Sequence, residues 1–152
     1  MKYIIDAEFI DTPTCSALIS FAIVREDERF CYFEFDYPQE ELTPWLRKHV
    51  VPHLNDPRLI SRHTFPWKAA AEIQDFIGFD IPQFWGYFAA YDWYWFCRLW
   101  GGFMNMPTHW PYLCREFALM QLGVPAVSGP QHHALNDSRS VLHAMKLLGM
   151  VS

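Results

Sequence analysis

The chain contains no apolar run long enough to cross a membrane. A spanning helix needs roughly 18 or more consecutive apolar residues. The acids Asp6 and Glu8 interrupt the N-terminal segment where the apolar part of a signal peptide would lie. We therefore expect a soluble, cytoplasmic protein with no membrane partner.

The cysteines show no zinc-binding spacing. Cys15, Cys31, Cys97 and Cys114 form no C-x-x-C pair and accompany no paired histidines. Buried free thiols are the simpler interpretation.

Positive charge is scarce: the chain has 12 Lys and Arg but 17 Asp and Glu, which gives a formal net charge of −5. This balance argues against a protein that holds long nucleic acids by a general positive field. The charge remains compatible with an enzyme that binds only a few nucleotides at one end of a nucleic acid. The candidate phosphate contacts are Arg58, Arg62, His63, Lys68 and Arg139. The alternative is that these residues are ordinary solvated surface.

Repeats, low-complexity segments and linkers are also missing. The 152 residues, half of them hydrophobic and 18% aromatic, are enough for one domain over residues 1–152 with a dense aromatic core or an apolar interface.

The order of apolar segments predicts an α/β fold, with one mixed sheet that begins as a three-stranded meander and is flanked by helices. We expect strands at residues 1–10, 15–24, 29–37 and 83–88, and a short strand near 110–113. A short helix starts at Pro44, with Trp45 and His49 on its buried face. Further helices are expected at residues 66–79, 91–100, 113–122 and 136–150.

The first strand ends in two acids. Because side chains alternate along a strand, Asp6 and Glu8 point to the same side, roughly 7 Å apart. Neighbouring carboxylates repel each other unless they share a cation or a proton, and oxygen ligands suit Mg²⁺ or Mn²⁺. The alternative is a pair of solvated acids at a strand end.

Asp92 occupies the first turn of the helix expected at residues 91–100, where an acid also stabilises the helix start. Its sequence neighbours are nearly all aromatic. A carboxylate buried among them needs a specific partner.

Asp137 lies near the start of the last helix, where it too could be a first-turn acid. Two histidines, His132 and His133, precede it. A histidine on a loop that enters a rigid element is well placed to act as a base near neutral pH, and spacing alone does not choose between the two.

These segments, in this order, resemble the three motifs of the DEDDh 3′-5′ exonucleases of the ribonuclease T-like superfamily. Small size, acidic charge and an aromatic second motif make the chain most similar to the actinobacterial polyadenylate-specific 3′-exoribonucleases. The matching segments are Asp6-Ala7-Glu8, Ala89-Ala90-Tyr91-Asp92 and His132-His133-Ala134-Leu135-Asn136-Asp137.

The resemblance implies a ribonuclease H-like fold and release of nucleoside 5′-monophosphates from the 3′ end of single-stranded RNA, including adenine-rich tails. It implies that two divalent cations are held by four acids, Asp6, Glu8, Asp92 and Asp137. The family's His-x-Ala-x-x-Asp spacing assigns the general base to His132. Many relatives have His-Asn where this chain has Tyr87-Phe88, a difference that bears on substrate preference.

Three residues beside the acids are candidates for substrate binding. Phe9 and Ile10 follow the first acidic pair, and Phe88 precedes Asp92. Stacking of a base on an aromatic ring is tolerant of sequence. The alternative, favoured for Phe88, is that these residues belong to the core.

Two other functions remain open: a DNA exonuclease with the same site, and a non-catalytic nucleic-acid-binding or partner-binding module of the same fold. The aromatic helix that begins at Tyr91 and ends at Trp100 is a candidate homodimer surface, with core packing as the alternative.

Overall fold

The fold is built on one six-stranded mixed sheet with strand order β4-β3-β2-β1-β5-β6. The computed structural model describes residues 1–56, 59, 61–62, 65–117 and 129–151. The expected meander is confirmed: β1 (Lys2–Asp11), β2 (Ser16–Arg25) and β3 (Phe30–Glu34) are successive antiparallel neighbours. The other three strands pair in parallel: β4 (Ser61–Arg62), β5 (Gln83–Gly86) and β6 (Arg115–Glu116).

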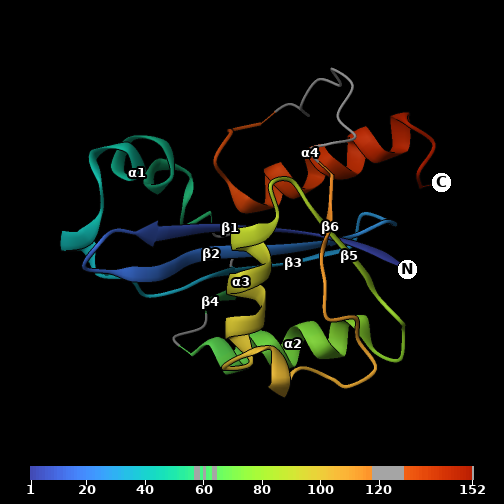
Figure 1. Cartoon of the computed structure of the whole chain (residues 1–152). Helices are drawn as coiled ribbons and strands as arrows, with labels where there is room; N and C mark the ends of the chain where they lie inside the picture. Colours follow the sequence, from blue (N-terminus) through green and yellow to red (C-terminus); the bar gives the residue numbers. More distant parts are fainter. Residues whose placement is uncertain (57–58, 60, 63–64, 118–128, 152) are drawn as a thin grey trace.

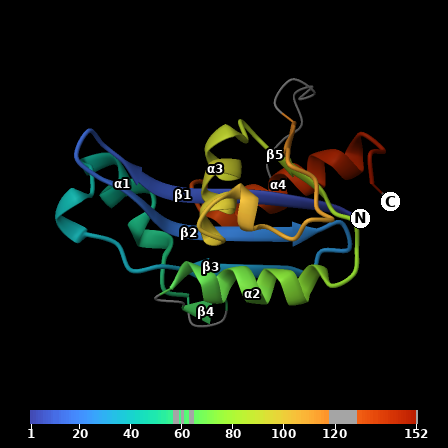
Figure 2. The same cartoon turned by 60° about the horizontal axis from the view of Figure 1, so that its bottom comes forward.

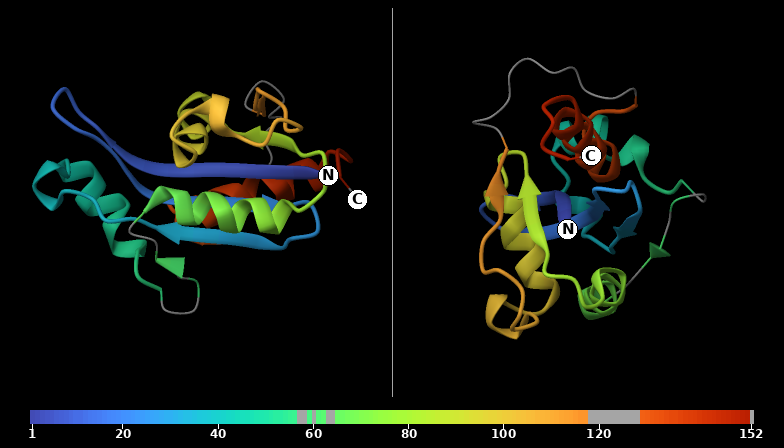
Figure 3. Two further views of the ribbon diagram at one scale, coloured as in Figure 1. Left: turned by 90° about the horizontal axis from the view of Figure 1, so that it is seen from below. Right: turned by 90° about the vertical axis from the view of Figure 1, so that its right-hand side faces the viewer.

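Helices cover both faces of this sheet (Figure 1). The longest, α4 (Ala134–Leu147), lies over one face across β1 and β2. The opposite face carries α2 (Pro66–Ile77), and α3 (Ala90–Leu99) runs beside the β5 edge (Figure 2; Figure 3, right). A short helix, α1 (Pro44–His49), covers the far end of β1.

Strands that are apolar on both sides explain these layers. Ile5 and Phe21 pack against Ile73 of α2, whereas Ile4 and Val24 face α4. A third cluster under α1 joins strand residues to Leu42, Leu46 and Val50.

The sheet opens beside the acidic end of β1. Parallel pairing between β1 and β5 covers only Lys2 to Ile4, after which the chain leaves β5 and enters α3. Gly86 makes this departure possible, because a Cβ there would lie 2.7 Å from the Ala89 Cβ and 3.4 Å from the Ile5 carbonyl oxygen. The start of α3 therefore lies next to the unpaired part of β1.

Several expected helix boundaries are confirmed. Thr43 caps α1 by accepting a hydrogen bond from the Leu46 amide, with Pro44 in the first turn. Pro66 begins α2, and Gly78, with φ of 63°, ends it. Three 3₁₀ turns complete the described elements: η1 (Gln39–Glu41), η2 (Val51–His53) and η3 (Phe103–Asn105).

The helix expected at residues 113–122 is wrong over its described part. Arg115 and Glu116 form β6, because the open edge of β5 offers backbone partners at Trp85 and Gly86; residues 118–122 lie outside the described chain. All four cysteines are free, but only Cys97 is fully buried. None of the described helices has the length and apolar character that a bilayer span requires.

Candidate active site

Three acids from the two ends of the sequence meet at one point. Asp6 and Glu8 on β1 and Asp137 in the first turn of α4 each offer a carboxylate oxygen, and these oxygens lie within 4.8 Å of one another. Three of the four expected acids therefore lie together in space.

Asp92 stands beside this trio on α3 and is only 6% exposed. Its Oδ1 accepts a hydrogen bond of 3.0 Å from the Ala7 amide. That amide lies between Asp6 and Glu8 on the part of β1 that β5 leaves unpaired. The open edge of the sheet thus positions the fourth acid.

The acids strain one another electrostatically. Burial raises the pKa of Glu8 to about 8, helped by the negative charges of Asp137 and Asp92. Burial, followed by Asp92, Glu8 and Asp137, raises the pKa of Asp6 well above its usual range. Burial raises the pKa of Asp92 to about 7 against the lowering effect of the Ala7 hydrogen bond. Such a group of carboxylates binds protons at neutral pH unless cations replace them.

The β1–β2 register shifts between Glu8 and Phe9, where Ile19 of β2 has no partner on β1. Phe9 keeps the alternation of β1 and packs on the same cluster as Ile5 and Ala7. The Phe9 ring stacks on Tyr91 of α3, with ring centroids 5.1 Å apart. Phe9 also lines a cavity of about 350 Å³ against the start of α3.

Ile10 does not share this position. Its side chain is fully buried in the cluster beneath α1, and its assignment to substrate binding stays a prediction. The cluster of Leu42, Leu46 and Val50 covers it.

His132 is held tightly beside Asp137. Its amide donates a 2.9 Å hydrogen bond to Asp137 Oδ2, and its φ is 60°, a left-handed conformation that is rare outside glycine. Its half-buried ring meets Trp45 edge-on at 4.7 Å and lies 5.9 Å from the His49 ring. Trp45 is 48% exposed, so its expected burial in the core is wrong: it forms a wall beside His132.

His133 occupies a different environment. Only 4% of it is exposed, its ring stacks on Tyr32 at 4.9 Å, and burial lowers the pKa of its imidazole. Its Nδ1 has no hydrogen-bond partner within the described chain. The two adjacent histidines therefore differ in exposure and in neighbours.

Phe88 is 68% exposed, so its expected place in the core is wrong. The reason is a turn with φ of 53° at Phe88, held by Glu116 of β6. The Glu116 carboxylate accepts one hydrogen bond from the Phe88 amide, 2.8 Å, and one from the Ala89 amide, 2.9 Å. The Phe88 ring is consequently available at the surface just before α3.

Comparison of the whole chain with known proteins identifies its relatives. No family model matches the sequence. Two curated 3′-5′ exoribonucleases of Mycobacterium tuberculosis, from strains CDC 1551 / Oshkosh and ATCC 25618 / H37Rv, are each 31% identical to it over 163 aligned positions. Each alignment covers 97% of this chain and 93% of the relative.

The chain belongs to this 3′-5′ exoribonuclease family. The expectation of an exoribonuclease enzyme is thereby confirmed at the level of the family.

The donor set of this exoribonuclease fits a hard divalent cation. The clustered ligand atoms are all carboxylate oxygens, the type that Mg²⁺ and Mn²⁺ prefer. Burial and the repulsion between the acids raise the pKa values of Asp6 and Glu8, and a bound cation would relieve that repulsion.

Several residues that lie beside the acids give no functional signal in the sequence. Glu116 falls inside an expected helix, and no local pattern connects it to Phe88. Trp45 and His49 show only a core-packing pattern. Tyr91 follows the second motif's alanines, but its contact with Phe9 joins α3 to β1 and leaves no local pattern.

Proposed function

We propose that this protein is a metal-dependent 3′-5′ exoribonuclease that trims single-stranded RNA to nucleoside 5′-monophosphates. The observation that carries the proposal is the meeting of Asp6, Glu8 and Asp137 in a chain of this family. Asp92 is the fourth acid of the site. Together these four would hold two divalent cations, Mg²⁺ or Mn²⁺.

Such cations, when bound, lower the pKa of water and neutralise charge on a phosphodiester. The protein's own contribution is geometric. The carboxylates are fixed by β1, α3 and α4 before substrate arrives, so little reorganisation is needed during the reaction. An acid cluster of this kind gives a non-catalytic binding module no advantage beside phosphates.

His132 is the proposed general base. It takes the proton of the attacking water as the water oxygen bonds to phosphorus and the bond to the 3′-oxygen breaks. The contact of its amide with Asp137 fixes the backbone, while Trp45 limits the ring's movement. His133 is buried against Tyr32 and is the weaker candidate.

The substrate's terminal base is proposed to lie between Phe9 and Phe88. Phe9 lines the cavity beside α3, and Phe88 is exposed at the start of that helix. Base stacking on such rings contributes about 1 to 3 kcal/mol for each base. Aromatic surface in place of polar contacts is consistent with a preference for adenine, which offers the large face of a purine.

Finer assignments belong to the same proposal. The strand order and the parallel β1–β5 pair support a ribonuclease H-like fold of the DEDDh type, in a single domain over residues 1–152. Exposed Tyr91 and Tyr94 support a homodimer through α3. A cytoplasmic location accords with free cysteines.

The test is degradation of adenine-tailed RNA labelled at either end. With Mg²⁺ or Mn²⁺, 3′-labelled RNA should release labelled AMP at once, and 5′-labelled RNA should give a ladder that shortens from the 3′ end; chelator should stop both. Asp6→Asn should reduce turnover by at least about 100-fold, whereas the exposed matched control Asp36→Asn should not. Near wild-type activity of Asp6→Asn disproves the assignment, and faster degradation of the DNA counterpart identifies a DNA exonuclease.

A further inference from the structure

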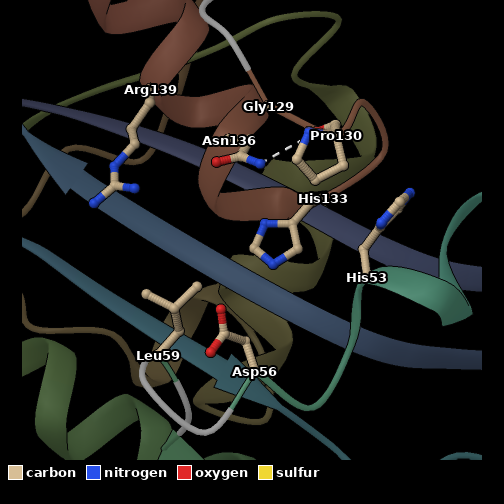
Figure 4. A pocket seen from close by; sticks show the side chains of 8 residues that line it. All are labelled: His53, Asp56, Leu59, Gly129, Pro130, His133, Asn136 and Arg139. Atoms are coloured by element: carbon tan, nitrogen blue, oxygen red, sulfur yellow. Dashed lines mark hydrogen bonds between the residues drawn. The ribbon is translucent and has the colours of Figure 1, made fainter.

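A second cavity lies against α4, and its lining includes none of the four acids. It has a volume of about 550 Å³, within the usual range for ligand sites. We call it the α4 pocket, and Figure 4 shows its lining. Its principal side chains are His53, Asp56, Pro130, His133, Asn136 and Arg139.

His133 forms the inner wall of the α4 pocket. Figure 4 shows its ring between Asp56 on one side and Asn136 on the other. The residue is 96% buried, from its 4% exposure, and its Nδ1 lacks a partner among the residues that the structure describes. A buried polar atom without a partner is unfavourable, and a ligand group that reached Nδ1 from the pocket would remove this cost.

Arg139 places a positive charge at the α4 pocket, in a protein whose formal net charge is −5. Arg139 holds its guanidinium 4.6 Å from the centre of the Phe30 ring, and it makes no ion pair within the described residues. His53 stands across the opening from it (Figure 4). These groups suit a phosphate, whereas the carboxylate of Asp56 suits a donor such as a base amino group.

The α4 pocket begins within one helical turn of the acid cluster. Asn136 lines the pocket, and the next residue, Asp137, belongs to the acids. Burial raises the pKa of Asp137, and among the groups that lower it are His132 and His53. The side chain of His53 is therefore within electrostatic reach of both sites.

We propose that the α4 pocket holds one nucleotide of the RNA strand upstream of the nucleotide that is removed. Arg139 and His53 contact its phosphate, and His133 Nδ1 with Asp56 contacts the edge of its unstacked base, as in other single-strand readers. This inference rests on the proposed function, because it assumes that an RNA 3′ end occupies the acid cluster. It explains how an acidic enzyme retains a polyanion without a general positive field.

The test compares RNA of two lengths with the full-length protein. Arg139→Met removes the charge but keeps an unbranched apolar side chain over Phe30; Arg98→Met makes the same charge change at an exposed position on α3 and is the matched control. Cleavage is measured as kcat/KM on an octanucleotide and on a dinucleotide without a 5′-phosphate, whose only phosphate is the scissile one and which therefore lacks the group assigned to Arg139. Binding of the fluorescent octanucleotide is measured by anisotropy in Ca²⁺ at several salt concentrations.

We expect Arg139→Met to reduce kcat/KM on the octanucleotide about tenfold and to leave the dinucleotide unchanged. The salt dependence of octanucleotide binding should lose about 0.7 in its logarithmic slope, the value for one phosphate contact on a single strand. Arg98→Met should show neither effect. Equal losses on both lengths, or no loss on either, overturn the proposal.

The binding arm separates this inference from the proposed function. If no RNA is cleaved by the wild type, the proposed function fails, and the anisotropy of Arg139→Met against Arg98→Met still decides whether the α4 pocket binds RNA. A calorimetric titration with AMP gives the remaining distinction. AMP binding that is as tight as octanucleotide binding, and equally weakened by Arg139→Met, overturns the strand assignment in favour of a free-nucleotide site.

Discussion

Replacing Glu8 by Gln should stabilise the metal-free protein at alkaline pH. Burial and the neighbouring acids raise the pKa of Glu8 from 4.5 to about 8. Between these values the folded protein keeps a proton that the unfolded chain has lost. The free energy of unfolding of the wild type should therefore decrease as pH rises through this window and level off above it.

The size of the effect follows from the width of that window. The two pKa values of Glu8 differ by roughly three and a half units, and each unit corresponds to about 1.4 kcal/mol. The loss in the free energy of unfolding is therefore at most about 5 kcal/mol. Since the repulsion is shared with Asp137 and Asp92, we expect Glu8→Gln to gain about 1 to 3 kcal/mol at pH 8. That gain raises the melting temperature by about 2 to 12 °C for a chain of this size.

The assay is thermal unfolding in chelator at pH 5 and pH 8, with Glu40→Gln as the exposed control. Glu8→Gln should match the wild type at pH 5 and exceed it at pH 8, and Glu40→Gln should match it at both. Added Mg²⁺ should raise the melting temperature of the wild type at pH 8 and raise that of Glu8→Gln much less. A variant no more stable than the wild type at pH 8, or a metal-free wild type that gains stability with pH, would refute the reasoning.

Three further variants test the groups around the acids. Glu116→Gln should lose about 1 to 3 kcal/mol of stability in denaturant titration, because an amide cannot replace the charged acceptor of two backbone hydrogen bonds. Phe88→Gly should keep or gain about 1 kcal/mol of stability, since glycine tolerates the positive φ, yet raise KM for RNA; a stability loss above about 2 kcal/mol would show that the ring is structural. Trp45→Ala should change the melting temperature little, because the ring is half exposed, and lower kcat at unchanged KM; unchanged kcat would show that His132 needs no such wall.

The sequence predicted the fold where local patterns decide it. The meander, α1, α2 and α4 follow from apolar periodicity, helped by Thr43 and Pro44 at the start of α1 and by Pro66 and Gly78 at the two ends of α2. The mistaken helix at residues 113–122 has an apolar spacing that suits a helix, but Arg115 and Glu116 pair with the open edge of β5. A strand edge left unpaired by another part of the chain leaves no trace in the local pattern.

The acids of the candidate site were predicted for a similar reason. Asp92 and Asp137 lie in the first turn of a helix, whereas Asp6 and Glu8 lie within β1, where the alternation of side chains puts them on one face. The surroundings of these acids were not predictable from the sequence. Phe88 is exposed because Glu116 fixes its backbone, and Ile10 is buried because α1 lies over it; both depend on contacts between distant segments.

The clustered acids come from both ends of the sequence, so the order of synthesis decides when the proposed site is complete. Asp6 and Glu8 leave the ribosome early, but Asp137 follows every other element of the site. A nascent chain that lacks α4 lacks Asp137 and therefore holds an incomplete set of the clustered acids. The proposed site can assemble only after nearly the whole chain has been synthesised.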